Sequence, residues 1–298
     1  MSEAIIDERL RQIVLASGED AQDEVPVARL AHYLVAVGGK PPEPADALDI
    51  AAAEEIMESM GRVAPELLYE RRAMIRARAA SRLAAAEGVP AEVRQGTGAE
   101  AVELVGSEIS HDGFFLTRTM RLRHPVFEGG LSGEVRREVF VATDAALVLP
   151  YDPQRDRVLL VEQFRMGPYG RGDPRPWMLE PIAGRVDAGE TPEDTARREA
   201  LEEAGLELTT LEHIASHYCS PGCSTEYFHL YLGIADLAED RQGRGGLEAE
   251  HEDIRTHVLD YAGAMRLLET GEADNGPLIL SLIWLSRERA RLRAEGTR

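Results

Sequence analysis

The sequence has few of the features that mark secreted and membrane proteins. Only two cysteines, Cys219 and Cys223, occur in 298 residues, which fits a reducing compartment. Their spacing is loose for a zinc site, so buried or free thiols are expected. The apolar stretch at 278–284 is shorter than the about 20 residues that span a bilayer, and no signal peptide is indicated at the start. We therefore expect a cytoplasmic protein with no membrane partner.

Basic residues are also scarce relative to acidic ones. The sequence has 33 lysines and arginines against 53 aspartates and glutamates, which gives a formal net charge of −20. Such a charge repels nucleic-acid phosphates, so a nucleic-acid partner is not expected. A small nucleotide ligand is compatible with this charge, because a bound divalent cation can dominate the field inside one cleft. The hydrophobic content of 44% is sufficient for a packed core.

Residues 1–95 are rich in alanine and indicate a helical region of unknown role. A proline-rich segment at 40–44 is typical of a stiff linker within it. Helices are predicted from Ser2, at 27–37, at about 46–60 and at about 66–87.

Several arginines lie within the predicted helix at 66–87. They form either a binding face for phosphates or a partner, or a solvated surface on an acidic protein. The sequence leaves both alternatives open for Arg71, Arg72, Arg76, Arg78 and Arg82.

The pattern changes to that of strands after residue 95. Residues 96–142 are expected to form a set of N-terminal strands, and residues 143–298 the main domain that follows them. Strands packed with a few helices, without regular alternation of the two, indicate an α+β fold with a mixed sheet. Strands are predicted at 114–122, 134–142, 145–149, 158–164, 211–218, 226–234 and 254–259, and the last helices at 261–269 and 277–293.

The most informative stretch of the chain predicts a helix at about 192–204. Thr191 and Asp194 have the spacing of a variant capping box, and Pro192 falls at the first helical position. Gly205 suits the left-handed residue just past a helix end.

Three glutamates on this helix, Glu199, Glu202 and Glu203, lie on one face and one turn apart. Crowded carboxylates repel one another, so the cluster calls for a counter-cation. Oxygen ligands alone favour a hard ion such as Mg²⁺ or Mn²⁺. The alternative is an acidic face that is solvated, or paired with Arg197 and Arg198.

The spacing of these residues resembles the Nudix box, Gly-x5-Glu-x7-Arg-Glu-U-x-Glu-Glu-x-Gly-U, in which U is aliphatic. Only the small Ala200, at the first aliphatic position, departs from it. The resemblance implies the Nudix fold, a mixed sheet sandwiched by helices, with the box as loop–helix–loop. The fixed positions are Gly184, Glu190, Arg198, Glu199, Glu202, Glu203 and Gly205.

The same resemblance implies roles for the box residues. Arg198 would hold Glu190 in an ion pair, and Gly184 would permit a tight turn into the box. Glu202 would assist catalysis directly or through water. The metal ligands that the resemblance implies are Glu199, Glu203, Glu202 and the backbone carbonyl of Ala183.

The flanking sequence is similar to that of the ADP-ribose pyrophosphatases, from about Phe114 to the C-terminus. The similarity includes Val161-Glu-Gln-Phe-Arg165, Trp177-Met-Leu-Glu-Pro-Ile-Ala-Gly184 and Ser220-Pro-Gly222. For Phe114, Phe115 and Arg137, the alternative is an ordinary position in a strand without a role in binding. The substrate-binding residues that the resemblance implies are Arg137 and Arg165 for phosphate or ribose oxygens, Phe114 or Phe115 for adenine, Glu226 for ribose hydroxyls, and Glu180 and Pro221.

An acidic loop at 237–252 has the length and composition of a lid. In the related pyrophosphatases such a loop carries a glutamate that acts as base or metal ligand. Alignment places Glu250 at the position of the base and Glu252 at that of an auxiliary metal ligand. Glu248 is also close, and the choice among the three stays open.

These resemblances imply a Mg²⁺-dependent enzyme that hydrolyses ADP-ribose to AMP and ribose 5-phosphate. The related enzymes are homodimers, so the strands at 96–142, with Phe114, Phe115 and Arg137, are expected to line the partner's site. The alternatives are another nucleotide derivative (GDP-mannose, NADH or a dinucleoside polyphosphate) and a nucleotide-sensing module without catalysis. Residues 1–95 faintly resemble the front half of longer Nudix proteins named for tellurite resistance, which implies no chemistry.

Overall fold

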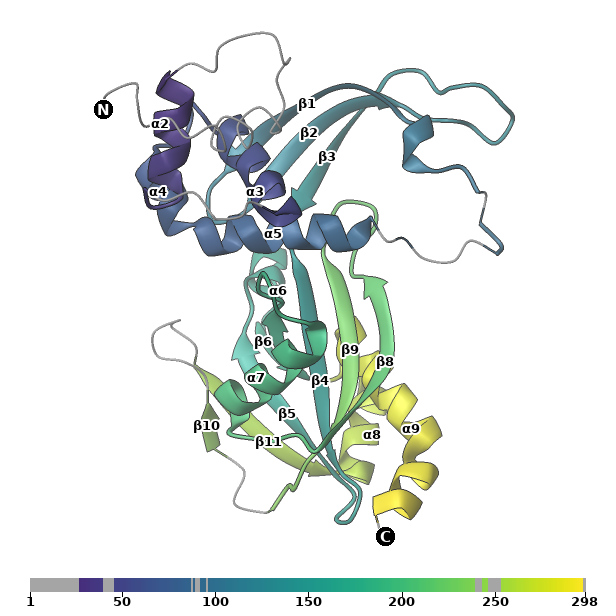
Figure 1. Ribbon diagram of the computed structural model, residues 1–298. Helices are drawn as coiled ribbons and strands as arrows, with labels where there is room; N and C mark the ends of the chain where they lie inside the picture. Colours follow the sequence, from purple (N-terminus) through teal and green to yellow (C-terminus); the bar gives the residue numbers. More distant parts are fainter. Residues whose placement is uncertain are drawn as a thin grey trace. The chain divides into compact units, whose positions relative to one another are not determined.

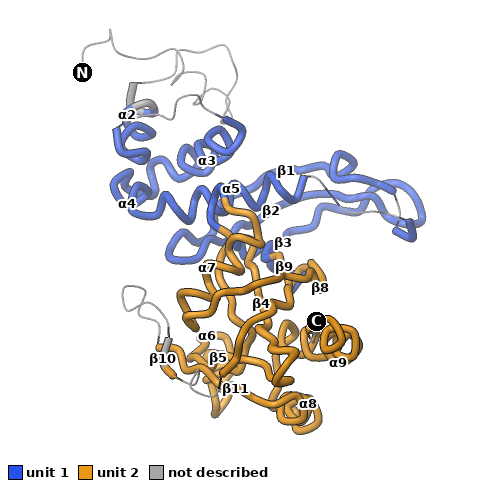
Figure 2. The backbone as a smooth tube through the Cα atoms, turned by 60° about the horizontal axis from the view of Figure 1, so that its bottom comes forward, with its two compact units in different colours: residues 1–143, 187–189, 220–226 blue, residues 144–186, 190–219, 227–298 orange. Residues whose placement is uncertain are grey.

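The computed structural model of the protein consists of two compact units (Figures 1 and 2). Unit 1 contains residues 1–143, 187–189 and 220–226, and unit 2 contains residues 144–186, 190–219 and 227–298. The structure describes residues 27–39, 46–86, 88, 92–94, 96–238, 243–245 and 253–296.

The described N-terminal part of unit 1 is helical, as predicted. Asp46 caps the second of its helices through a capping box with Asp49. The prediction of a single helix at 66–87 was wrong. Arg71 has a non-helical backbone (φ −91°, ψ 5°) and divides the segment into two helices. The expected helix from Ser2 and the linker at 40–44 lie outside the described residues. The helices are α2 (Val27–Ala36), α3 (Ala47–Glu58), α4 (Pro65–Glu70) and α5 (Arg72–Ala85).

These helices share one apolar core, which is built around Tyr33, Ile56, Leu68 and Ile75. The break at Arg71 allows residues of both α4 and α5 to face this core. Three of the arginines of α5 bind acidic residues of α3 and so join the two helices, whereas Arg72 donates to the carbonyl of Tyr69. The pairs are Arg76 with Asp49, Arg78 with Glu55, and Arg82 with Glu54.

A three-stranded antiparallel sheet completes most of unit 1, in the order β1-β2-β3. Strand β1 was not predicted, because most of its residues are exposed and show no apolar alternation. A short turn at 113–115 connects it to β2. The strands are β1 (Glu103–Asp112), β2 (Leu116–Arg123) and β3 (Val135–Val141).

Unit 2 is built on a mixed sheet in the order β10-β11-β5-β4-β9-β8, with β6 beside β5 and β7 beside β4. The central strand β4 is parallel to β9 and antiparallel to β5 and β7. The strands are β4 (Asp144–Asp152), β5 (Arg157–Phe164), β6 (Trp177–Glu180), β7 (Ile182–Arg185), β8 (Thr210–Tyr218), β9 (Tyr227–Ile234), β10 (Gly243–Gly245) and β11 (Ile254–Asp260).

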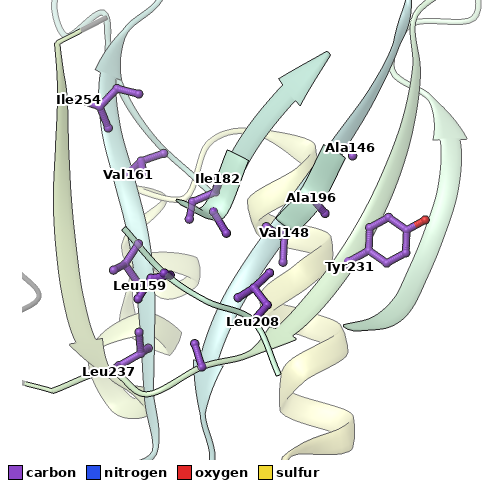
Figure 3. Close-up of a cluster of buried hydrophobic side chains, with 13 residues drawn as sticks. Ala146, Val148, Leu159, Val161, Ile182, Ala196, Leu208, Tyr231, Leu237 and Ile254 are labelled. Atoms are coloured by element: carbon purple, nitrogen blue, oxygen red, sulfur yellow. The ribbon is translucent and has the colours of Figure 1, made fainter. Parts of the chain in front are cut away.

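Helices cover both faces of this sheet (Figure 1). Val148 and Leu159 pack with α7 (Pro192–Ala204), in the cluster that Figure 3 shows. The next residues along the same strands, Leu149 and Leu160, pack with α8 (Tyr261–Thr270) and α9 (Gly276–Gly296). The short helix α6 (Met166–Arg171) follows β5. This architecture confirms the predicted α+β fold, with a mixed sheet between helices. Among the described helices, none has an apolar stretch long enough to cross a membrane.

The turn between β4 and β5 depends on Asp156, a non-glycine residue with a positive φ of 58°. Its carboxylate accepts hydrogen bonds from the buried Tyr151 hydroxyl (2.7 Å) and from Nε of Arg289 on α9 (2.9 Å). Burial raises the pKa of Asp156, but the hydrogen bonds from Arg289 and Tyr151 outweigh it, so the pKa lies below its usual value. A carboxyl with a lowered folded-state pKa stabilises the fold above its unfolded pKa, and this stabilisation is lost as pH falls through the folded value.

We expect Asp156→Gly to lower the free energy of unfolding by about 2–3 kcal/mol, because the charge-assisted hydrogen bonds are lost. Asp156→Ala should cost about 1 kcal/mol more, since alanine disfavours the left-handed conformation that glycine accepts. Urea denaturation at neutral pH measures both values. A glycine variant as stable as the wild type would show that the carboxylate is not needed for the turn.

Candidate functional site

The loop and helix that were predicted from local signals form as expected. Helix α7 spans Pro192–Ala204, and Thr191 caps it in a capping box with Asp194. Gly205 ends the helix in the left-handed conformation, with φ 60°. The buried side of α7 carries Ala196 and Ala200, so the small residue at the first aliphatic position of the box, Ala200, packs directly on the sheet.

Glu199 lies over the backbone of Gly184. Strand β7 pairs with the central strand β4, and Gly184 is opposite Ala146, which packs with α7. A Cβ atom at Gly184 would lie 1.7 Å from Oε1 of Glu199 and 2.0 Å from its Cδ. Only a glycine therefore leaves room for this carboxylate at this position of β7.

Arg198 is the centre of the charged network on α7. Its Nε donates to Glu190 (2.9 Å), and its Nη1 donates to Glu199 (2.6 Å) and Glu202 (3.0 Å). Its Nη2 also donates to the carbonyl of Arg185 (3.2 Å), on the strand that contains Gly184. The hydrogen bond to Glu190, followed by the charge of Glu199, raises the pKa of Arg198 further above its usual range, against the effect of burial.

The residues of this turn fit a hard divalent cation. Among the described residues, no group of three or more acidic, histidine or cysteine side chains is already gathered as a metal site. Glu199 and Glu202 both pair with Arg198. The donors nevertheless consist entirely of oxygen, from carboxylates and a strand carbonyl, which Mg²⁺ and Mn²⁺ prefer. Gly184 provides the space in which the Glu199 carboxylate approaches the backbone. Glu203, on the same turn, is only 2% exposed.

A second charged pair, Arg165 with Glu180, lies on the same face of the sheet as α7. Glu180 is opposite Val161 in the β5–β6 pairing, and Val161 packs in the cluster under α7. Nε of Arg165 donates to Glu180 at 2.8 Å. Burial raises the pKa of Glu180, and Arg165 opposes this rise only in part. The pairing therefore brings together two of the residues that the sequence predicted for substrate binding.

In unit 1, aromatic residues connect two segments that were predicted to bind substrate. One carries Phe114 and Phe115, and the other is Ser220–Glu226. The rings of Phe114 and Phe115 are 4.9 Å apart, and that of Phe115 is 5.0 Å from Phe140 on β3. The backbone of Phe140 in turn bonds to the segment Ser220–Glu226, through N–H to the carbonyl of Cys223 (2.8 Å). The segment that contains Pro221 and Glu226 is thus tied to the strand that supports the two phenylalanines.

Comparison with known proteins gives the family. Residues 141–282 match the NUDIX domain family. The ADP-ribose pyrophosphatase of Escherichia coli (strain K12) is 41% identical over 198 residues, which cover 66% of this chain and 94% of that protein. The chain belongs to the Nudix family.

Two further relatives show the breadth of this similarity. The ADP-ribose pyrophosphatase of Haemophilus influenzae (strain KW20) is 40% identical over 193 residues, which cover 64% of this Nudix protein and 88% of the relative. The GDP-mannose pyrophosphatase of Escherichia coli O139:H28 is 33% identical over 156 residues, which cover 51% and 80% of the two chains.

The remaining predicted site residues of this Nudix protein have the following places. Arg137 lies on β3 and donates from Nη1 to the carbonyl of Arg136 (2.9 Å). Cys219 and Cys223 are not joined in a disulfide, and both are exposed rather than buried. The loop residues Glu248, Glu250 and Glu252 lie outside the described residues.

Two residues next to these segments were not singled out from the sequence of this Nudix protein. Phe140 links the phenylalanine pair to the segment Ser220–Glu226, and Asp112 receives hydrogen bonds just before Phe114. The sequence pattern of β3 predicted a strand at Phe140, but nothing in it distinguished this residue from an ordinary strand residue. Asp112 gave none, because its partners are 41 and 53 residues away in the chain.

Proposed function

We propose that this Nudix protein hydrolyses the pyrophosphate bond of ADP-ribose and releases AMP and ribose 5-phosphate. The observation that carries the proposal is the placement of the complete box, with the Glu199 carboxylate over Gly184 and two further glutamates on the same helical turn. The 41% identity to an ADP-ribose pyrophosphatase, over 94% of that protein, supports the substrate.

The residues that would hold Mg²⁺ or Mn²⁺ are Glu199, Glu202, Glu203 and the carbonyl of Ala183. When bound, the cation neutralises charge that develops on the diphosphate and makes water a better nucleophile. Arg198 keeps the loop before α7 in place through Glu190, and it neutralises the carboxylates by binding two of them. Glu250 would accept a proton from the attacking water, with Glu252 as an auxiliary ligand.

Several further residues would recognise the substrate. Arg165 is a fixed cation for a phosphate oxygen, and its pairing with Glu180 orients the guanidinium. Phe114 or Phe115 would stack on the adenine, since both rings are exposed. Glu226 would accept hydrogen bonds from ribose hydroxyls. Arg137 would add a second cation for phosphate, and Pro221 would shape the segment Ser220–Glu226.

The protein would act as a cytoplasmic homodimer, in which the strands of residues 96–142 of one subunit line the site of the other. Exposed aromatic residues on this region, Phe114 and Phe115, are the kind of side chain that such an interface uses. Light scattering combined with activity measurement tests this assembly. A fully active monomer would contradict it.

A hydrolysis assay over a panel of nucleotide derivatives tests the proposed substrate. We expect ADP-ribose to be cleaved with the highest kcat/KM in the presence of Mg²⁺, and no cleavage after chelation with EDTA. GDP-mannose is the second candidate, because a GDP-mannose pyrophosphatase is 33% identical to this chain. NADH and a dinucleoside polyphosphate complete the panel. Preference for another compound would exclude ADP-ribose as the main substrate. If no compound of the panel is hydrolysed, the protein is a nucleotide-sensing module.

A further inference from the structure

The helical segment of unit 1, α3 to α5, is bonded to strands β1 and β2. Nη2 of Arg118 on β2 donates to Glu58 on α3 at 2.6 Å. Nη1 of Arg62, just after α3, donates to the carbonyl of Ile109 on β1 at 3.0 Å. The helices and the strands are therefore held together by charged side chains that are far apart in the sequence.

Asp112, the last residue of β1, is held by the helical segment at both of its carboxylate oxygens. The hydroxyl of Ser59 donates to Oδ2 (3.1 Å), and Nη1 of Arg71 donates to Oδ1 (3.2 Å). Ser59 is 1% exposed, and Asp112 is 18% exposed, so water competes little for these bonds. Arg71 is the residue at which α4 ends and α5 begins, so the break between these helices places its side chain toward β1.

The residues that follow Asp112 form the turn that carries the phenylalanine pair. The N–H of Gly113 donates to the carbonyl of Phe115 at 3.0 Å, and Asp112 is opposite Leu116 in the sheet. Phe114 is 77% exposed and Phe115 is 53% exposed. Two large rings exposed at the tip of a tight turn indicate a binding function.

We propose that the helical segment is a substrate-positioning element, which acts through Arg71 and Ser59 on Asp112 to fix the turn that carries Phe114 and Phe115. The inference rests on the proposed function, in which these rings bind the adenine. The alignment with the Escherichia coli ADP-ribose pyrophosphatase uses 94% of that protein but only 66% of this chain. About a third of this chain therefore lies outside the alignment with that relative.

A turn fixed before binding loses less conformational freedom when the substrate arrives. Release of Asp112 should therefore weaken the binding of ADP-ribose but leave the chemical step on α7 unchanged. This combination corresponds to a higher KM at constant kcat. Loss of general stability would instead lower the melting temperature with KM unaltered.

The test compares Arg71→Ala, Asp112→Ala and the double variant, in the full-length protein. We expect each single variant to raise KM for ADP-ribose about three- to tenfold, with kcat within about twofold of the wild type. The double variant should be no worse than the single ones, because all three lose the same contact. Arg71→Lys, which keeps the charge, should restore part of the affinity.

Arg82→Ala is the matched control. It removes another arginine pair of α5, with Glu54 on α3, that does not involve the strands, and should leave KM unchanged. Phe114→Ala should raise KM at least as much as Arg71→Ala. If the wild-type protein cleaves ADP-ribose but KM is unaltered in Arg71→Ala and Asp112→Ala, the positioning role is overturned and the proposed function stands. If the wild type cleaves no nucleotide sugar, both are overturned.

Discussion

Replacement of Glu199 by glutamine is expected to lower kcat for ADP-ribose by at least ~10²-fold, in line with the loss of one electrostatic stabiliser of the transition state. The glutamine amide keeps the size of the side chain but lacks the negative charge that a divalent cation requires. Because the carboxylate lies over Gly184, we expect no other side chain of the turn to replace it at this position.

The same substitution should leave the fold intact. Crowded carboxylates on one helical face destabilise a helix, so removal of one charge relieves repulsion between Glu199 and its neighbours. Arg198 keeps its hydrogen bonds to Glu190 and Glu202, which hold the loop before α7. We expect far-ultraviolet circular dichroism and the melting temperature to remain close to those of the wild type.

Glu207→Gln is the control for this experiment, because it makes the same chemical change at an exposed residue just past α7. Steady-state kinetics with Mg²⁺ measures the effect of the substitution on turnover. Titration calorimetry with Mn²⁺ measures its effect on metal binding separately. Turnover near the wild-type rate in Glu199→Gln would remove this residue from the metal site. Normal Mn²⁺ affinity with a large loss of kcat would assign it to a later step than metal binding.

The boundaries of α7 could be predicted because their causes are local. The capping box of Thr191 with Asp194, and the left-handed Gly205, depend only on residues within a turn of each helix end. The ion pair of Arg198 with Glu190, which the resemblance to the Nudix box implied, is also present. By contrast, the break at Arg71 had no glycine or proline to mark it, and the periodicity continued through it.

Contacts between strands could not be predicted, because they depend on register. The position of Glu180 on the α7 face follows from its pairing with Val161, and neither β6 nor β7 is long enough to show a periodic pattern. The place of Gly184 under Glu199 likewise depends on how β7 pairs with β4. The family resemblance gave the identity of these residues, whereas the geometry that joins them required the fold.

The arginines of α5 illustrate a further limit of sequence reasoning. Their spacing is compatible with a binding face, a solvated face or a set of internal ion pairs. Only the position of α3 decides among these, since Asp49, Glu54 and Glu55 lie on that helix. Net charge has the same weakness: a value of −20 says nothing about which acidic residues are already neutralised inside the molecule.

Gly184→Ala should lower kcat about 10- to 100-fold without unfolding the protein, through displacement of Glu199. The new methyl group would lie 1.7 Å from Oε1 and 2.4 Å from Cγ of Glu199, which no carboxylate can tolerate. The atoms in conflict belong to the far part of a flexible side chain, so Glu199 moves to another rotamer and β7 keeps its pairing with β4. The energy cost to the fold is therefore small, whereas the ligand leaves its position.

A double-mutant cycle separates this explanation from general damage to the strand. If Gly184→Ala acts by displacing Glu199, the double variant with Glu199→Gln should be little worse than Glu199→Gln alone, because one carboxylate cannot be lost twice. Gly170→Ala, in α6 of the same unit, is the matched control, since its added Cβ meets nothing within 4 Å. Multiplicative losses in the double variant would show that Gly184 serves catalysis by another route, such as close approach of its backbone to the diphosphate.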